Sequence, residues 1–147
     1  MCGIAGIAGH RAISHSHRVA RMVGALSHRG PDDSGIFRST NCVLGHSRLS
    51  IVDLDSGQQP MHSFDGSLSI TFNGEIYGYD EIKKTIKDKY PFQTNSDTEV
   101  ILALFHQYGD LMMDHLPGMF AFAIWDEKKQ RLFCGRDRFG EKPFYYG

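Results

Sequence analysis

The sequence has few cysteines and no strong excess of charge of either sign, and it contains no long hydrophobic run. Its 147 residues include 3 cysteines, at positions 2, 42 and 134, and no CxxC pair. A sparse, odd-numbered set of this kind excludes a disulfide framework and a cysteine-based zinc site, and it is typical of a reducing cytosol. We therefore expect a cytoplasmic protein.

The near balance of charge argues against two classes of partner. Sixteen lysines and arginines stand against 17 acidic residues, so the net charge is −1. Binding to nucleic acid or to an anionic membrane surface needs a basic excess, which this chain lacks. The N-terminus has no basic region followed by an apolar stretch, and no apolar run approaches the ~18 residues of a membrane-spanning helix. We expect no nucleic acid, no membrane and no signal peptide.

The 8 histidines do not form a metal-binding pattern. The closest pair, His15 and His17, would point to different sides of a helix and has no acidic neighbours of the kind found in metal motifs. We expect no metal site.

Apolar residues follow both helix and strand periodicities. The length and the 41% hydrophobic content suit one domain with a packed core. We expect helices at 17–26, after an Asp80 cap, and after a capping box formed by Ser96 and Glu99. Strands are expected at 3–8, 36–37, 42–46, 68–73, 120–125 and 131–136. Because the segment 120–125 is apolar on both faces, the sheet is expected to be covered on both sides, in a layered α+β fold.

Cys2 offers a nucleophile at the start of the chain. A small residue at this position permits removal of Met1, which would leave Cys2 with a free α-amine. An α-amine titrates near ~7.7–8.0, so part of it can accept the thiol proton at neutral pH. Taken alone, position 2 is more simply interpreted as a small residue that happens to be cysteine, and the rest of the chain reverses this interpretation.

Three further positions carry polar groups suited to a small zwitterion. Arg48 stands beside an apolar run and can bind a carboxylate through its planar guanidinium, or form an internal salt bridge. Asn73 and Gly74 end an expected strand and could form an oxyanion hole, or simply a turn. Asp97 could hold an ammonium, or only favour the start of its helix. Glutamine, with its α-carboxylate, α-ammonium and side-chain amide, matches this set together with the thiol.

Seven stretches in one order resemble a known family. The sequence is similar to the glutaminase domain of class II glutamine amidotransferases, most closely that of asparagine synthetases. The stretches are MCGIAGI at 1–7, HRGPDDSG at 28–35, GHSRLSIVDLDSGQQPM at 45–61, FNGEIY at 72–77, NSDTEVIL at 95–102, LPGMFAFAIWD at 116–126 and GRDRFGEKPFYYG at 135–147. They are spread over the whole chain, from residue 1 to residue 147.

The resemblance implies a fold and catalytic roles. The fold would be the four-layer αββα sandwich of N-terminal nucleophile hydrolases. Cys2 would be the nucleophile that forms a γ-glutamyl thioester, with its own α-amine as the base. Asn73 and the backbone N–H of Gly74 would hold the oxyanion.

The resemblance also implies how the substrate is bound. Arg48 would hold the α-carboxylate of glutamine, and Asp97, with Glu75, would hold the α-ammonium. The backbone around three further residues would line the pocket: Leu49, Ile51 and Val52. Arg29 is charged and lies in the second of these stretches, near the expected site, but no role follows for it.

Two departures from the family stand out. Gly78 replaces the asparagine that usually follows FNGEIY, which would loosen that turn. Family members also continue into further glutaminase strands and an ATP-using synthetase domain. We therefore expect residues 2–147 to be a glutaminase domain that is incomplete at its C-terminus, with the synthetase domain absent. No cofactor is expected in this domain, since ATP and Mg²⁺ would serve only the synthetase domain.

The implied function is hydrolysis of L-glutamine to glutamate and ammonia. A synthetase domain or chain would be the partner, using ATP and the ammonia to amidate aspartate; homodimerisation is left open. Two alternatives remain. One is a non-catalytic truncated remnant or interaction module, and the other is a glutaminase that serves a different carboxylate acceptor.

Overall fold

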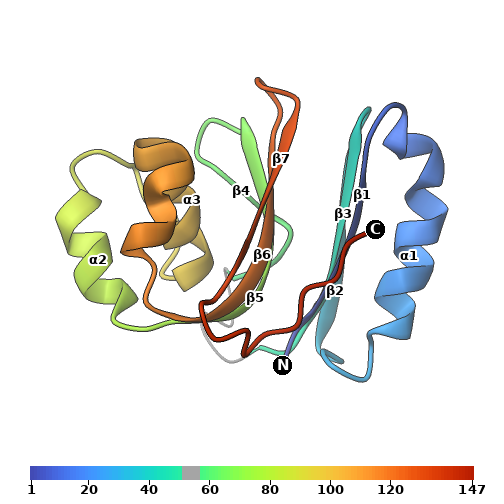
Figure 1. The fold of residues 1–147 in the computed structure, drawn as a ribbon, viewed down its shortest axis with the longest axis horizontal. Helices are drawn as coiled ribbons and strands as arrows, with labels where there is room; N and C mark the ends of the chain where they lie inside the picture. The colour runs from blue at the N-terminus through green and yellow to red at the C-terminus, as the bar shows by residue number, and fades with distance from the viewer. Residues whose placement is uncertain (51–56) are drawn as a thin grey trace.

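Two antiparallel sheets lie face to face between helices, as Figure 1 shows for the computed structural model, which describes residues 1–50 and 57–147. The first sheet has the order β1 (Gly3–Ala8), β3 (Cys42–Arg48), β2 (Asp33–Ser39). The second has the order β4 (Met61–His62), β5 (Leu68–Ile76), β6 (Gly118–Asp126), β7 (Arg131–Arg136). The four-layer αββα arrangement expected from the sequence is therefore present.

Helices cover the outer face of each sheet. The short 3-10 helix η1 (Ala12–His15) leads into α1 (Ser16–Ala25), which lies on the first sheet. The helices α2 (Tyr79–Ile86) and α3 (Asp97–Tyr108) lie on the second sheet, and η2 (Gly109–His115) follows α3. None of the helices in the described ranges is long and apolar enough to cross a membrane.

Each interface between layers has its own buried cluster. The largest joins α2 and α3 to the second sheet and includes Ile101, Leu104, Phe122 and Ile124. A smaller cluster between the sheets contains Leu44 and Trp125, while α1 packs onto the first sheet through a third group: Val19, Val23 and Val43. Apolar side chains on both faces of β6 are thus buried, as the two-sided pattern of 120–125 predicts.

Two expected helix starts differ in detail from the structure. Gly78, rather than Asp80, is the N-cap of α2, with φ of 63° and no side-chain cap. Glycine adopts this left-handed backbone without steric cost, and asparagine also tolerates it, so the substitution fits the turn instead of loosening it. Ser96 does cap α3 by accepting the Thr98 N–H (3.2 Å). Glu99 does not complete the capping box, because its carboxylate accepts the N–H groups of residues 93 and 94 instead.

Candidate active site

Cys2 directly precedes β1, and Figure 1 shows the N-terminus at one end of the two facing sheets. Its Sγ is 3.4 Å from the backbone nitrogen of Leu49 and 3.7 Å from the Leu49 carbonyl oxygen. Arg29, for which the sequence assigned no role, donates from Nε to the Cys2 carbonyl (3.2 Å). Two different segments therefore hold Cys2: Arg29 bonds to its backbone carbonyl, and the backbone of Leu49 contacts its thiol.

A cavity of about 120 Å³ opens beside Cys2. It receives residues from both sheets, from the start of α3 and from the segment after β7. Among the lining residues are all the site candidates within the described ranges: Cys2, Arg48, Leu49, Asn73, Gly74, Glu75 and Asp97. Ile51 and Val52, also expected to line the pocket, lie outside the described residues.

Asn73 and Gly74 lie within β5, not in a turn. The strand continues to Ile76, so the alternative reading of Asn-Gly as a turn is wrong. Gly74 pairs with Phe120 of β6 and has φ of 158°, and a Cβ there would stand 2.2 Å from the Met119 carbonyl oxygen. Only glycine fits so close to the neighbouring strand, and Asn73 beside it is buried against solvent. A rigid strand thus carries the proposed donor pair.

Asp97 is the first residue of α3 and is buried. Its Oδ2 accepts the backbone N–H of Ile76 (3.1 Å), which links the helix to the end of β5. Burial raises the pKa of the Asp97 carboxyl, hydrogen bonds from the backbone of Ile76 and Thr98 oppose this rise, and the charge of Glu75 adds to it. Two acids in one small cavity favour a cationic group between them, as an α-ammonium would be.

Arg48 ends β3, is buried, and lines the same cavity as Cys2. A cation from the first sheet and two acids from the second sheet and α3 therefore line the same space. This separation of charge suits a zwitterion whose two ends differ in sign.

Several pocket residues were not predicted from the sequence as site residues. Gln59 accepts the Phe72 N–H at its Oε1 (2.7 Å) and donates from Nε2 to Thr98 (3.4 Å), so it ties β5 to α3 behind the cavity. Met119 and Lys142 also line the cavity, as do Gly57, Phe72, Ser96 and Thr98. For Gln59, Met119 and Lys142 the only signal was their place inside the stretches 45–61, 116–126 and 135–147 that resemble the family, because tertiary packing alone brings them together.

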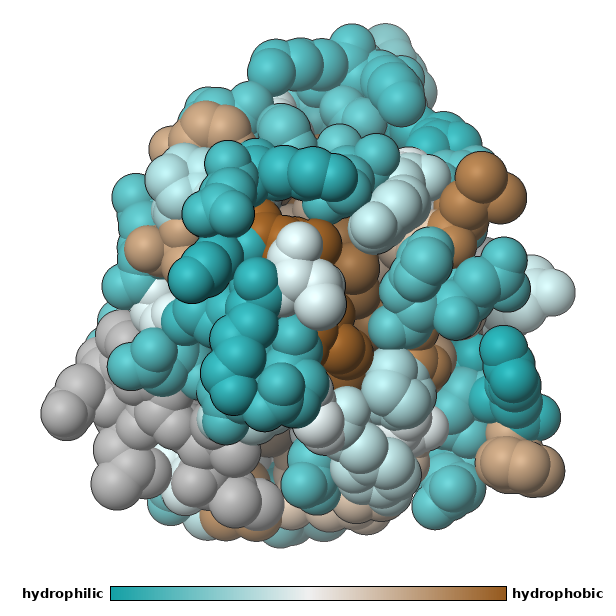
Figure 2. Space-filling model, turned by 90° about the vertical axis from the view of Figure 1, so that its left-hand side faces the viewer, coloured by the Kyte–Doolittle hydropathy of each residue, from teal (hydrophilic) through white to brown (hydrophobic). Residues whose placement is uncertain are grey.

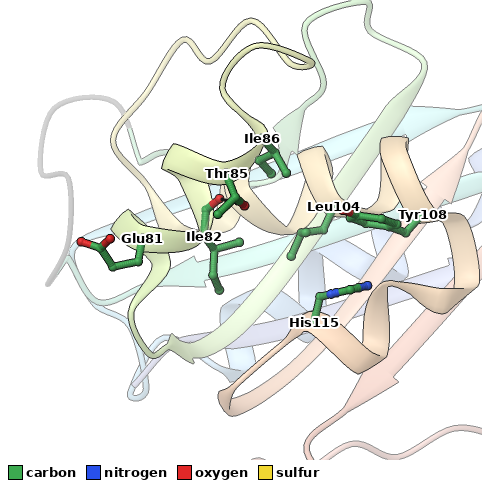
Figure 3. A pocket seen from close by; sticks show the side chains of 7 residues that line it. All are labelled: Glu81, Ile82, Thr85, Ile86, Leu104, Tyr108 and His115. Carbon is green, nitrogen blue, oxygen red and sulfur yellow. Dashed lines mark hydrogen bonds between the residues drawn. The ribbon is translucent and has the colours of Figure 1, made fainter.

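A larger cavity, about 270 Å³, lies on the outer helices. Figure 3 shows its lining from α2, α3 and η2: Glu81, Ile82, Thr85, Ile86, Leu104, Tyr108 and His115. Figure 2 views the molecule from this side and shows hydrophobic residues in a hollow ringed by hydrophilic ones. This cavity contains no cysteine and shares no residue with the Cys2 cavity, so the larger of the two cavities is not the candidate site. Within the described residues, no group of three or more histidine, cysteine or acidic side chains is placed to hold a metal ion.

Over the whole length of this chain, its sequence is similar to that of asparagine synthetases and of an amidase. It is 42% identical to asparagine synthetase B (glutamine-hydrolyzing) of Escherichia coli, covering 100% of this chain and 27% of that protein. It is 40% identical to asparagine synthetase 3 of Bacillus subtilis, covering 99% and 25%. An amidase of Gibberella zeae, chry2, is also 40% identical, over 99% of this chain and 24% of its own length. The chain thus spans about a quarter of the length of these relatives.

A solved structure shares the fold. Glutamine phosphoribosylpyrophosphate amidotransferase of Bacillus subtilis superimposes with a TM-score of 0.69, at 23% identity, over 86% of this chain and 35% of that one. This likeness confirms the N-terminal nucleophile hydrolase fold expected from the sequence.

The family itself is shown by a match that covers the chain from end to end. Residues 1–147 match the model of the glutamine amidotransferase domain. Relatives at about 40% identity agree with that match. The chain therefore belongs to the glutamine amidotransferase domain family of enzymes.

Proposed function

We propose that this domain hydrolyses L-glutamine to glutamate and ammonia through a thioester on Cys2. The observation that carries the proposal is the single cavity that receives the Cys2 thiol, the Asn73–Gly74 pair and the Arg48 and Asp97 side chains. A nucleophile, oxyanion donors and two charged anchors of opposite sign within one small space fit an amide substrate that is also an amino acid.

The reaction proceeds in two steps on these residues. The α-amine of Cys2 takes the thiol proton, and the thiolate attacks the side-chain amide carbon of glutamine. The oxyanion is held by the Asn73 side chain and the Gly74 N–H, and ammonia leaves with the proton returned by the α-ammonium. Water then cleaves the thioester, which releases glutamate and restores the thiol.

Removal of Met1 is part of this proposal. Met1 lines the cavity beside Cys2, and its amide link to Cys2 occupies the nitrogen that must act as the base. The residue is about half exposed, at 51%, which agrees with a place at the mouth of the cavity. Without Met1 the space beside Cys2 is larger and the α-amine is free.

The ammonia would pass to an ATP-dependent synthetase that amidates aspartate, in a further domain or partner chain. Relatives named asparagine synthetase, about four times as long as this chain, support this acceptor. ATP and Mg²⁺ would be required only there. A second candidate, a glutaminase that serves another carboxylate, is favoured by the relative named an amidase, which is equally similar to this chain.

Labelling with 6-diazo-5-oxo-norleucine tests the glutaminase step. Intact mass and peptide sequencing should show loss of Met1 and a single adduct on Cys2, and Cys2→Ala should abolish the adduct. Cys134→Ala is the matched control, because Cys134 is exposed and outside the cavity, and this variant should label normally. A processed chain that takes no adduct, or takes it at Cys134, would contradict the proposal and favour a non-catalytic remnant.

A further inference from the structure

Lys142 is a buried cation at the Cys2 cavity that the proposed mechanism does not yet use. Its side chain lines the cavity, and the residue is only 5% exposed. The one hydrogen bond of its Nζ among the described residues runs to the Met1 sulfur (2.7 Å). None of the ion pairs within these residues includes Lys142. A thioether is a weak acceptor, so within the described residues no carboxylate is bonded to this buried ammonium, although such a charge normally needs one.

The backbone around Lys142 is firmly held. The Asp137 carboxylate accepts the Lys142 N–H (3.0 Å), the Phe120 N–H (3.2 Å) and two further N–H groups of the same loop. Arg136 donates from Nε to the Lys142 carbonyl (2.7 Å). Since Phe120 pairs directly with Gly74, this network fixes Lys142 to the strand that faces the oxyanion donors. The backbone position of Lys142 at the cavity is therefore built into the fold.

Loss of Met1 changes the surroundings of this charge. The thioether that contacts the Lys142 ammonium leaves with Met1, and the ammonium then borders the same space as the Cys2 thiol. Three other charged side chains line the cavity: Arg48 from the first sheet, and Glu75 and Asp97 from β5 and α3. A fourth, Arg29, is not part of the lining and bonds to the Cys2 carbonyl. Without Lys142 the cavity wall would have two acids and one cation, a balance that opposes a negative sulfur.

We propose that Lys142 is a positioning residue whose ammonium stabilises the Cys2 thiolate once Met1 has been removed. The inference rests on the proposed function, because it concerns the nucleophile of that reaction. It adds a residue that acts through Cys2 by charge and needs no contact with glutamine. Lys142→Met removes the charge at similar length, and Lys142→Arg retains it.

The test is the pH dependence of Cys2 alkylation by iodoacetamide, followed at the Cys2 peptide by mass spectrometry. Without glutamine present, Lys142→Met should raise the midpoint of the rate profile by about one pH unit, the effect of a unit charge at close range in a partly buried site. Lys142→Arg should stay near the wild-type midpoint. Lys89→Met, which removes an exposed lysine outside the cavity, is the matched control and should shift nothing.

Two results would overturn the inference: a Lys142→Met midpoint equal to wild type, or a Lys142→Arg midpoint as high as that of Lys142→Met. Circular dichroism checks that each variant folds, and Lys142→Gln replaces Lys142→Met if that variant does not. Failure of the proposed function looks different. If the wild-type protein does not hydrolyse glutamine, but Lys142→Met still shifts the midpoint of Cys2 alkylation, the glutaminase proposal is contradicted and the charge effect of Lys142 is supported.

Discussion

His46 joins the two sheets one residue away from Asn73. Its Nε2 donates to the carbonyl of Phe72 (3.0 Å), so a strand of the first sheet is bonded to the strand that carries the oxyanion donors. The ring is fully buried, and its Nδ1 has no hydrogen-bond partner among the described residues. Burial lowers the pKa of His46 to about 4; the bond to Phe72 opposes this shift and the charge of Arg48 adds to it. A neutral imidazole is thus part of the support of the site.

This arrangement predicts acid sensitivity. The unfolded chain binds a proton at His46 near pH 6.5 and the folded chain only near 4, so the free energy of unfolding falls as pH drops through this window, by roughly 3 kcal/mol in total. His46→Gln keeps an N–H donor and does not titrate, so urea denaturation at pH 5 and 7 should show a smaller difference than in wild type. His10→Gln, at an exposed position, is the control. If the difference in the free energy of unfolding between pH 5 and pH 7 were the same in His46→Gln as in wild type, His46 would not be the source of the acid sensitivity.

Asn73 should matter for turnover more than for binding. Because an oxyanion donor acts mainly in the transition state, Asn73→Ala should lower kcat for glutamine hydrolysis by roughly 10²–10³ with a nearly unchanged KM. Asn41→Ala, which removes an amide outside the cavity lining, is the control and should change neither kcat nor KM. A kcat near the wild-type value in Asn73→Ala would leave this residue as a structural part of β5.

Gly74 should tolerate no side chain. An added Cβ would stand 2.2 Å from the Met119 carbonyl oxygen, at a φ that other residues rarely adopt. Gly74→Ala is expected to lower the free energy of unfolding by about 2 kcal/mol or more and to abolish labelling of Cys2. Gly24→Ala is the matched control, since nothing lies within 4 Å of its Cβ in α1 and alanine should stabilise that helix slightly. Normal labelling of Gly74→Ala would show that the two strands can separate.

Local patterns in the sequence predicted most elements of this fold. The period of apolar residues located α1 and α3 to within a residue, and Gly109 at the end of α3 has the positive φ expected there. The N-cap of α2 was missed because backbone conformation at Gly78, not a side chain, starts that helix. The bonds of Glu99 were missed because the chain at 93–94 folds back over it, which no local pattern records.

In the candidate site, too, some residues could be predicted from the sequence and others could not. Its reactive groups stood out as unusual polar residues, and the structure brings every described one of them to a single cavity. The supporting residues did not stand out. Gln59 is an ordinary glutamine until its two bonds to β5 and α3 are seen, and Lys142 is an ordinary lysine until its burial is known. Charge and hydrogen bonding across elements decide such roles, and these depend on tertiary packing.

Arg48 should act mainly on substrate binding. A carboxylate contact is present in both ground and transition states, so Arg48→Ala should raise KM by roughly 30-fold or more while kcat changes little. Arg48→Lys should recover only part of this loss, because lysine has the charge without the planar fork. Arg21→Ala, on the exposed face of α1, is the control. An unchanged KM in Arg48→Ala would assign the arginine to an internal salt bridge.

Asp97 should show a conflict between stability and binding. Burial raises the pKa of its carboxyl, so the charged form is disfavoured in the folded protein without ligand, and folding is less favourable above that pKa than below it. Asp97→Asn removes this cost at pH 7 and can still accept the Ile76 N–H, so its melting temperature should equal or exceed that of wild type.

The same variant should bind glutamine poorly. An amide offers no charge to the α-ammonium, so KM should rise at neutral pH and should no longer increase further on acidification, as it does in wild type when Asp97 takes up a proton. Asp88→Asn, an exposed aspartate outside the cavity, is the control for both measurements. A large fall in melting temperature together with a normal KM would show that Asp97 only stabilises the start of α3 and does not bind glutamine. Higher stability together with weaker binding would instead show that the Asp97 carboxylate serves to bind glutamine and lowers the stability of the free protein.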